Sequence, residues 1–268
     1  MNLDLWKKKG TYFSFEKHRI FFIDEGAGEP LLLIHGFPTS SWDWSSLFPL
    51  LKKHYRLITL DMLGFGFSDK PQKHSYSIAE QANLIEGLLR HLKLSSVHIM
   101  AHDYGDTVTQ ELIARQLDQQ LPFQIQSVCF LNGGLFPEVH QPLLIQKLLM
   151  SPMGKWISLF FNQKKLTQNF NRIFASDTRP TPSEMNDFWR VLSYNNGNKV
   201  FHLLIRYMEE RRTYRARWVG GLQQTKVPLR LIDGLFDPIS GKHMLERYKV
   251  LVPNPDTIGL ENCGHFPL

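Results

Sequence analysis

Val97-His98-Ile99-Met100-Ala101-His102-Asp103-Tyr104-Gly105 is a short apolar run that ends in a polar turn. The run before the turn is typical of a buried strand, and Thr107–Leu117 after it has the apolar spacing of a helix. The small residues Ala101 and Gly105, two positions before and after Asp103, would let the strand and the helix approach closely. These residues therefore predict a nucleophile elbow, which raises Asp103 above the sheet where such elbows commonly carry serine.

Short apolar runs alternate with longer amphipathic stretches along the rest of the chain. This alternation is typical of a parallel sheet, because each crossover between parallel strands must bring the chain back across the sheet, usually as a helix. We therefore predict an α/β fold with a mostly parallel central sheet flanked by helices. The expected strands are Ile20–Ile23, Leu31–His35, Arg56–Leu60, Val97–Ala101, Val128–Leu131, Leu229–Ile232 and Thr257–Gly259, and the expected helices are Ser77–Leu92, Thr107–Leu117 and Lys242–Val250.

The stretch between about Pro137 and Lys226 breaks this alternation. It is rich in aromatic and basic residues, has helical spacing and contains no convincing buried strand. A linker of this length without its own secondary structure would be unusual in a compact protein. We therefore expect residues 137–226 to form an inserted helical cap over the carboxyl edge of the sheet, with residues 1–136 and 227–268 forming the core.

The composition excludes several classes of protein. Of the 268 residues, 43% are hydrophobic and 21% are charged, as in globular proteins and unlike disordered or collagenous chains. The 2 cysteines cannot form a disulfide framework, and a net charge of +6 accompanies no nucleic-acid-binding motif. Because no apolar run is long enough for a transmembrane segment, we expect a soluble, cytoplasmic protein with no nucleic-acid partner. Peripheral membrane association and the oligomeric state stay open.

The aspartate at the elbow indicates the type of reaction. No Gly-x-Ser-x-Gly motif occurs in the chain, so the usual serine nucleophile is missing. A carboxylate that attacks a saturated carbon bearing a leaving group forms a stable ester, which water can later open. Asp103 therefore favours epoxides or alkyl halides as substrates. The alternative is that Asp103 only caps the helix that follows it, a common role for aspartate.

A second polar turn, His35-Gly36-Phe37-Pro38, follows the expected strand Leu31–His35. In a fold of this type such a loop lies beside the elbow, and one of its backbone N–H groups can join that of the residue after the nucleophile in an oxyanion hole. We expect the N–H groups of Phe37 and Tyr104 to form this hole. The His35 side chain is better explained as a hydrogen-bonded residue that shapes the loop.

Acidic residues and a histidine follow the last two expected strands. Asp233 and Asp237 come after Leu229–Ile232, and His265 comes after the final strand. The order nucleophile, acid, histidine is the one used by enzymes with this elbow. We expect His265 to act as general base and Asp237 to hold its tautomer; Asp233 is the rival acid, at a strand end where its side chain is less free. No metal-binding motif occurs, so we expect neither metal nor cofactor.

Three motifs together resemble the α/β-hydrolase fold family, and specifically its epoxide hydrolase and haloalkane dehalogenase branch, whose nucleophile is an aspartate. They are His35-Gly36-Phe37-Pro38, the pattern D-x-x-G-x-G-x-S-D at Asp61–Asp69, and His102-Asp103-Tyr104-Gly105. Within this branch the chain is most similar to the mesoderm-specific transcript-like hydrolases. That similarity covers most of the chain and is carried by His35–Trp44, Leu63–Pro71, His102–Leu112, Asn132–Leu149 and Arg217–Gly221.

The resemblance also implies which leaving group is favoured. Dehalogenases of this branch usually carry Trp after the nucleophile and often Asn after His-Gly, where this chain has Tyr104 and Phe37. Epoxide hydrolases instead use cap tyrosines to bond the epoxide oxygen, and Tyr207, in a similar Tyr-x-x-x-x-Arg context, is the candidate acid. Their other cap tyrosine has no counterpart here, so Tyr194 is the candidate replacement. His35, His102 and Tyr194 are the remaining candidates for lining the pocket, although both tyrosines could simply pack over the core.

We therefore expect an epoxide hydrolase-like enzyme that uses a small hydrophobic electrophile and water through a covalent ester on Asp103. A haloalkane dehalogenase-like hydrolase and a binding or regulatory homologue with little turnover are the alternatives. The charged run Glu209–Arg217 is interpreted as a solvated helix face. Relatives usually continue into a final helix, whereas this chain ends at Leu268, so we expect a truncated C-terminus and a poorly supported His265 loop.

Overall fold

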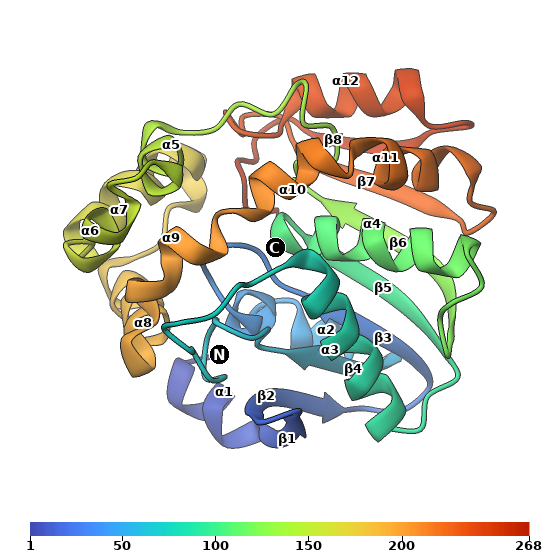
Figure 1. Cartoon of the computed structure of the whole chain (residues 1–268), viewed down its shortest axis with the longest axis horizontal. Helices are drawn as coiled ribbons and strands as arrows, with labels where there is room; N and C mark the ends of the chain where they lie inside the picture. The colour runs from blue at the N-terminus through green and yellow to red at the C-terminus, as the bar shows by residue number, and fades with distance from the viewer. Residues whose placement is uncertain (268) are drawn as a thin grey trace.

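The computed structural model describes residues 1–267, and the strands in this range form one sheet (Figure 1). The order across the sheet is β1-β2-β4-β3-β5-β6-β7-β8, and every neighbouring pair from β4 to β8 is parallel. The mostly parallel sheet predicted from the sequence is confirmed. The strands are β1 Thr11–Phe15, β2 His18–Glu25, β3 Glu29–Ile34, β4 Tyr55–Leu60, β5 Ser96–His102, β6 Gln124–Leu131, β7 Leu229–Gly234 and β8 Asp256–Leu260.

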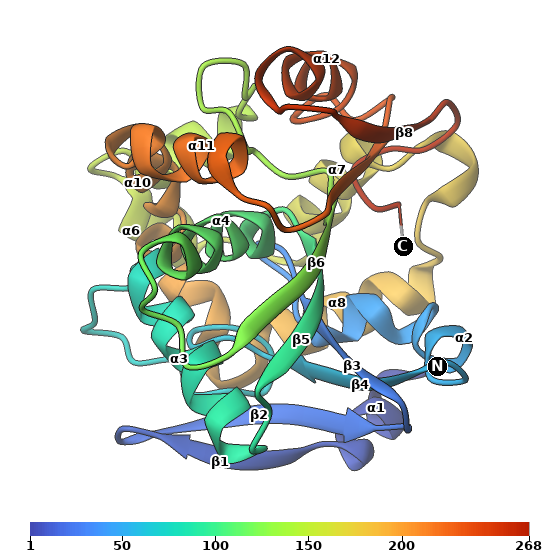
Figure 2. The same ribbon diagram turned by 90° about the vertical axis from the view of Figure 1, so that its right-hand side faces the viewer.

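Crossover handedness decides which face of the sheet each connecting helix covers. Right-handed crossovers between parallel strands put α3 (Ile78–His91), α4 (Tyr104–Leu117) and α12 (Lys242–Leu251) on one face. The short helix α2 (Phe48–Leu51) connects β3 to β4 in the opposite direction and lies on the other face, as Figure 2 shows for α2 and α4. Ser77 caps α3 as predicted, since its side chain accepts a hydrogen bond from the Glu80 N–H.

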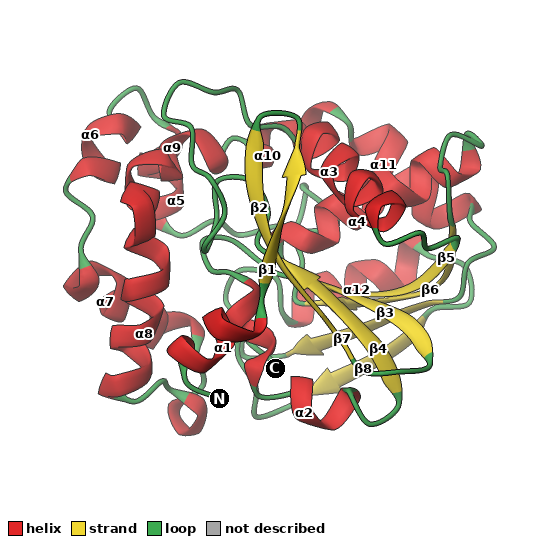
Figure 3. Cartoon of the chain, turned by 90° about the horizontal axis from the view of Figure 1, so that it is seen from below, coloured by secondary structure: helices red, strands yellow, loops and turns green. Residues whose placement is uncertain are grey.

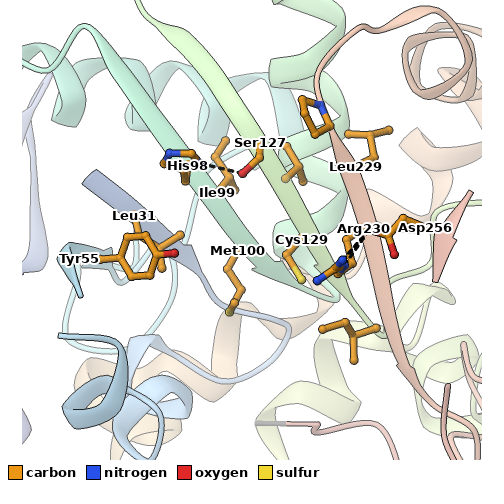
Figure 4. Close-up of a pocket in the computed structure, with 13 residues that line it drawn as sticks. Leu31, Tyr55, His98, Ile99, Met100, Ser127, Cys129, Leu229, Arg230 and Asp256 are labelled. Carbon is orange, nitrogen blue, oxygen red and sulfur yellow. Dashed lines mark hydrogen bonds and ion pairs between the residues drawn. The ribbon is translucent and has the colours of Figure 1, made fainter. Parts of the chain in front are cut away.

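Part of the face that carries α2 is open. A groove of about 400 Å³ runs along it, lined by residues of β3 to β8 that include the half-buried Met100, Cys129 and Ile232 (Figure 4). This groove lies on the flat of the sheet, whereas the polar residues singled out in the sequence follow the strand ends. It is therefore a feature separate from the predicted site.

The segment between β6 and β7 folds as helices, and within the described residues it contains no strand. Helices α5 to α9 gather on the side of the sheet to which the parallel strands point (Figure 3), while α11 packs against α4 in the layer of α3. The division into a core and a cap at residues 137–226 stays a prediction. The helices are α5 Leu144–Met150, α6 Gly154–Leu159, α7 Gln163–Ile173, α8 Pro182–Ser193, α9 Phe201–Leu204, α10 Tyr207–Thr213 and α11 Arg215–Gln224.

The N-terminal helix α1 (Leu3–Lys9) buries Leu3 and Trp6 against the rest of the chain. The two elements Ser41–Ser45 and Phe48–Leu51 between β3 and β4 pack next to it. No helix among residues 1–267 is both long and apolar enough to cross a bilayer.

Candidate active site

Asp103 forms the predicted tight turn between β5 and α4. Its φ of 47° and ψ of −100° lie in a region that non-glycine residues rarely adopt. The neighbouring Gly105 makes the turn possible, because a Cβ there would lie only 2.6 Å from the carbonyl oxygen of Ile34. Gly105 therefore lets α4 approach the neighbouring strand β3, rather than the strand β5 considered in the prediction.

The Asp103 carboxylate does not cap α4 in the described part of the chain. It is 3% exposed, and its Oδ2 accepts a hydrogen bond of 3.1 Å from the Phe37 backbone N–H. The contact brings together the elbow and the turn after β3, as predicted. Tyr104 begins α4, where backbone N–H groups lack partners inside the helix, and its ring packs between those of Phe65 and Tyr207.

The pKa of Asp103 reflects two opposing effects. Burial by itself would raise it, but the positive charges of His265 and Arg211, together with His102 and the Phe37 N–H, hold it below its ordinary value. The side chain is therefore a carboxylate at neutral pH. Buried carboxylates that stay ionised are found more often at functional sites than in packed cores.

His265 and Asp237 form a buried hydrogen-bonded pair. The His265 Nδ1 lies 2.7 Å from the Asp237 Oδ2, and the Ile239 N–H and the Ser240 hydroxyl also donate to this carboxylate. Burial opposes the charge on Asp237, but His265 and these donors lower its pKa to about 2. Burial likewise disfavours the charged imidazole, yet the carboxylates of Asp237 and Asp103 raise the pKa of His265 to about 9.

Asp233 does not reach His265. Its Oδ1 accepts a hydrogen bond of 2.9 Å from the Asn132 N–H, so the predicted choice of Asp237 over Asp233 agrees with the geometry. Asn132 itself was missed in the sequence. Its side-chain N–H donates to the Asp237 Oδ2 at 3.0 Å and to the Gly234 carbonyl oxygen at 3.2 Å. Its signal was an asparagine directly after a strand and before two glycines, which suits its φ of 43°.

The expectation of a poorly supported His265 loop is wrong. The His265 N–H donates to the carbonyl oxygen of Ile173, at the end of α7, with a distance of 2.8 Å. Phe266 stacks on Phe174 with ring centroids 4.6 Å apart and planes within 8° of parallel. Gly264 is required there, because a Cβ would lie 2.1 Å from the Ile173 carbonyl oxygen. The helical segment between β6 and β7 thus supports the histidine loop.

Of the two tyrosines proposed as acids, the structure brings one to Asp103. Tyr207 is 1% exposed, and its hydroxyl has no hydrogen-bond partner among residues 1–267. Burial and then the Asp103 charge raise its pKa above the ordinary value. Tyr194 instead lies partly exposed, with its ring against Phe67 and under the Lys7 ammonium group. It does not contribute to the Asp103 pocket.

Arg211 was missed, because the charged run Glu209–Arg217 was interpreted as a solvated helix face. That interpretation is wrong for this residue, which is 2% exposed. Its Nε–H donates to the Thr107 hydroxyl at 2.7 Å, and its Nη2–H donates to the Asp103 carbonyl oxygen at 3.1 Å. Both acceptors belong to the elbow and the first turn of α4. No local sequence signal distinguishes Arg211 from its exposed neighbour Arg212.

The two histidines named as pocket candidates hold loops together. His35 donates from Nδ1 to the Gly36 carbonyl oxygen and accepts at Nε2 from the Met62 N–H, as expected for a residue that shapes the loop. The His102 Nε2–H donates to the His265 carbonyl oxygen at 2.8 Å. Burial lowers the pKa of both imidazoles, that of His102 to about 4, so they are neutral. We assign them to positioning the Phe37 and His265 loops.

A cavity of about 60 Å³ lies beside Phe37 and His265. Its other walls are mostly apolar side chains of α5, α7 and α9, and the amide groups of Gln146 and Asn169 are the polar exceptions. Such a lining suits a small apolar molecule that two or three polar groups orient. Within the described residues, no group of three His, Cys, Asp or Glu side chains is arranged to hold a metal ion.

Comparisons with known proteins show the family and the fold of this chain. A family model described as alpha/beta hydrolase fold matches residues 29–268. The mesoderm-specific transcript protein of Mus musculus is 41% identical over 281 residues, covering 99% of this chain and 83% of that protein. Haloalkane dehalogenase 2 of Mycobacterium bovis is 32% identical, covering 98% and 90%. The structure of the epoxide hydrolase CorEH superposes with a TM-score of 0.76 at 19% identity, covering 96% and 92%.

Proposed function

Since this chain belongs to the alpha/beta hydrolase fold family, we propose that it is a hydrolase acting through a covalent ester on Asp103, with epoxides as the preferred substrates. One observation carries the proposal. The buried, ionised Asp103 occupies the elbow with its Oδ2 on the Phe37 N–H, next to the His265–Asp237 pair. A carboxylate in this position can attack a saturated carbon, whereas no serine is there to attack an ester.

In the first step, the Asp103 Oδ1 attacks the electrophilic carbon. The Oδ2 is the oxygen held by the Phe37 N–H, which leaves Oδ1 to form the new C–O bond. The epoxide C–O bond breaks, and its electron pair moves to the leaving oxygen. The Tyr207 hydroxyl, which has no partner of its own within residues 1–267, donates a proton to that oxygen. After the second step has left Asp103 as a carboxylic acid, that acid ionises and its proton returns through water to the tyrosinate, so that both residues regain their starting states.

In the second step, water hydrolyses the ester. His265 takes a proton from water, and the resulting hydroxide adds to the Asp103 carboxyl carbon. The Phe37 and Tyr104 N–H groups stabilise the oxyanion that forms on Oδ2. The bond from that carbon to Oδ1 then breaks, His265 protonates the departing oxygen, and the diol leaves. Ester formation removes the Asp103 charge that raises the pKa of His265, so the imidazole becomes a neutral base when it is needed.

The helical segment provides the rest of the site. Apolar residues of α5, α7 and α9 line the cavity, and α10 brings Tyr207 to Asp103. We infer that α5 to α10 form the cap over a core built from the sheet, and that α11, which packs on α4, belongs with the core layer. The cavity of about 60 Å³ favours small, hydrophobic electrophiles as substrates.

Dehalogenation is the second candidate, because a haloalkane dehalogenase is 32% identical over most of this chain. The two reactions share Asp103, His265 and Asp237 and differ in the leaving group. An alkoxide needs a proton, whereas a halide leaves without one. A Tyr207→Phe variant should therefore form ester about 100-fold more slowly from an epoxide, while ester formation from a matched alkyl bromide should change little.

The test of the proposal is to trap the ester. A His265→Gln variant is incubated with a panel of terminal epoxides and haloalkanes, and the peptide containing Asp103 is analysed by mass spectrometry. We expect an adduct with the mass of the intact epoxide, absent in the Asp103→Asn variant. In the wild-type protein, a single turnover in H₂¹⁸O should place ¹⁸O in Asp103. A folded protein that gives no adduct with either class would contradict the proposal and favour a binding or regulatory homologue.

A further inference from the structure

The buried Arg211 side chain contacts both Asp103 and Tyr207. It lies on α10, one turn after Tyr207, and its guanidinium carbon is 4.5 Å from the centre of the Tyr207 ring. Its Nη2 donates to the Asp103 carbonyl oxygen and lies 3.5 Å from Oδ1, the oxygen that the proposed reaction uses for attack. A buried guanidinium of this kind holds a fixed charge, because arginine does not lose its proton in proteins.

The surroundings of Arg211 are built around the side chain. Its Nε–H donates to the Thr107 hydroxyl, so the guanidinium is fixed on two atoms of the elbow and first helical turn. Gly134 leaves room for it, since a Cβ there would lie 2.1 Å from Nη1. Burying this charge without need would be costly. The contacts therefore serve the Asp103 carboxylate and not only the packing of α10.

One nitrogen of the Arg211 guanidinium makes no hydrogen bond within the described residues. Its Nη1 is buried and has no hydrogen-bond partner in the described part of the chain, as is true of the Tyr207 hydroxyl on the same helix. Unpaired buried donors are unfavourable until an acceptor arrives. Tyr194, the predicted partner of Tyr207, lies elsewhere, against Phe67 and Lys7. Tyr207 and Arg211 are thus the two donors from α10 beside the nucleophile.

We propose that Arg211 is a further catalytic residue of the reaction proposed above, on which this inference rests. The Phe37 N–H holds Oδ2, and the guanidinium, with Nη2 at 3.5 Å from Oδ1, keeps the attacking oxygen ionised and oriented. Its Nη1–H, with the Tyr207 hydroxyl, binds the oxygen of the substrate. The preferred substrate class is therefore a small epoxide or other electrophile that carries an oxygen acceptor at the attacked carbon.

The role of Arg211 is measured on ester formation in the His265→Gln variant, because this substitution removes the other positive charge near Asp103. The measured quantity is the rate of adduct formation with a terminal epoxide in a single turnover, between pH 4 and 9. Arg211→Gln in this background should slow the reaction about 100-fold and move its acidic limb upward by at least about one pH unit. Arg211→Lys, which keeps the charge, should recover part of the rate and keep the limb low.

The acidic limb must be assigned to Asp103 and not to a neighbour. Burial lowers the pKa of His102 to about 4 and that of His140 to about 3, so both stay neutral over most of this range. Burial raises the pKa of Asp106 well above its ordinary value, so an Asp106→Asn variant is the control for its titration. The titratable groups that face Asp103 are His35, Asp43, His102, Asp106, His140, Tyr207, Arg211 and His265.

Arg212→Gln is the matched control, because it removes an exposed arginine from the same helix and should leave both rate and pH profile unchanged. The inference is overturned if Arg211→Gln forms adduct at the parent rate with the parent pH profile. Should Arg211→Gln fail to fold, Arg211→Lys decides, since an unchanged limb with partial rate supports the role and full rate contradicts it. Absence of adduct in the His265→Gln parent would instead reject the proposed function itself.

Discussion

The sheet carries two hollows that differ in size and chemistry. The groove on its open face has a volume of about 400 Å³, against about 60 Å³ for the cavity at the strand ends. In the groove the polar groups pair with each other: His98 with Ser127 at 2.7 Å, and Arg230 with Asp256 at 2.8 Å (Figure 4). At the strand ends, where Tyr207 packs on the cavity residue Phe37 and Arg211 contacts Asp103, the Tyr207 hydroxyl and the Arg211 Nη1 have no partner among the described residues.

The larger hollow of this protein is therefore not the one proposed as its reactive site. The polar groups of the groove already have hydrogen-bond partners within the protein. Buried donors without acceptors, in contrast, gain a partner when a ligand binds. The sheet explains both positions. The parallel strands β3, β5, β6 and β7 end at the same edge and deliver Phe37, Asp103, Asn132 and the Asp237 loop there. The groove is lined by side chains from the middle and the amino-terminal ends of the strands, and by Pro228 just before β7.

Asp103→Asn should have the largest effect on activity. Asp103→Asn removes the nucleophile, so we expect steady-state hydrolysis of an epoxide to fall by at least about 1,000-fold. Asparagine is close in size, but it leaves the buried Arg211 without this counter-charge, so folding must be checked together with activity. The measurement is product formation together with near-UV circular dichroism. A folded variant that retains activity would show that Asp103 is not the nucleophile.

Asp237→Asn tests the second carboxylate. Asparagine would leave the His265 imidazole in the wrong tautomer and without its counter-charge, so ester hydrolysis should slow by about 100-fold to 10,000-fold. Ester formation should change much less, and the adduct on Asp103 should accumulate in rapid-quench samples. Asp233→Asn is the control, because the Asp233 carboxylate bonds the Asn132 N–H. If Asp233→Asn accumulates the ester and Asp237→Asn does not, the assignment of the acid is wrong.

Ester formation and ester hydrolysis should depend on pH in different ways, because the first needs the ionised Asp103 and the second needs the neutral His265. His265 is protonated below a pKa of about 9 in the free protein, and only its neutral form accepts a proton from water. Ester hydrolysis should therefore rise about tenfold per pH unit on the acidic side and level off below pH 9, because the ester lacks the Asp103 charge. Ester formation should stay flat down to the lowered pKa of Asp103. A hydrolysis rate independent of pH would argue against His265 as the base.

Gly134→Ala tests the position of Arg211 by steric crowding, without changing any charge. The new Cβ would lie 2.1 Å from the Arg211 Nη1, so Arg211 must move or the loop must shift. We expect about 1–3 kcal/mol of lost stability and about tenfold slower ester formation. Gly220→Ala on α11 is the control, because its Cβ would come no nearer than 3.4 Å to the Gln224 side chain. That change should be neutral or slightly stabilising, as expected for alanine in a helix.

The sequence predicted what local patterns encode. Apolar runs identified β2 to β8, and small residues around Asp103 identified the elbow. β1 (Thr11–Phe15) was not predicted, because it is a short edge strand whose only fully buried side chain is Phe13, so it has no apolar run. Arg211 could not be found either. Its burial depends on Thr107 and Asp103, about a hundred positions away, and nothing near Arg211 in the chain records that contact.

The smallest expected effect lies in the groove. Burial raises the pKa of the Cys129 thiol to about 12, so it stays protonated at neutral pH, and the thiolate is the reactive form. Cys129→Ser should change epoxide hydrolysis by less than about twofold. In the wild-type protein, iodoacetamide should modify Cys129 far more slowly than a free thiol at pH 8, without loss of activity. A large loss of hydrolysis in the Cys129→Ser variant would mean that the open face of the sheet takes part in the reaction, and the contrast between the two hollows would fail.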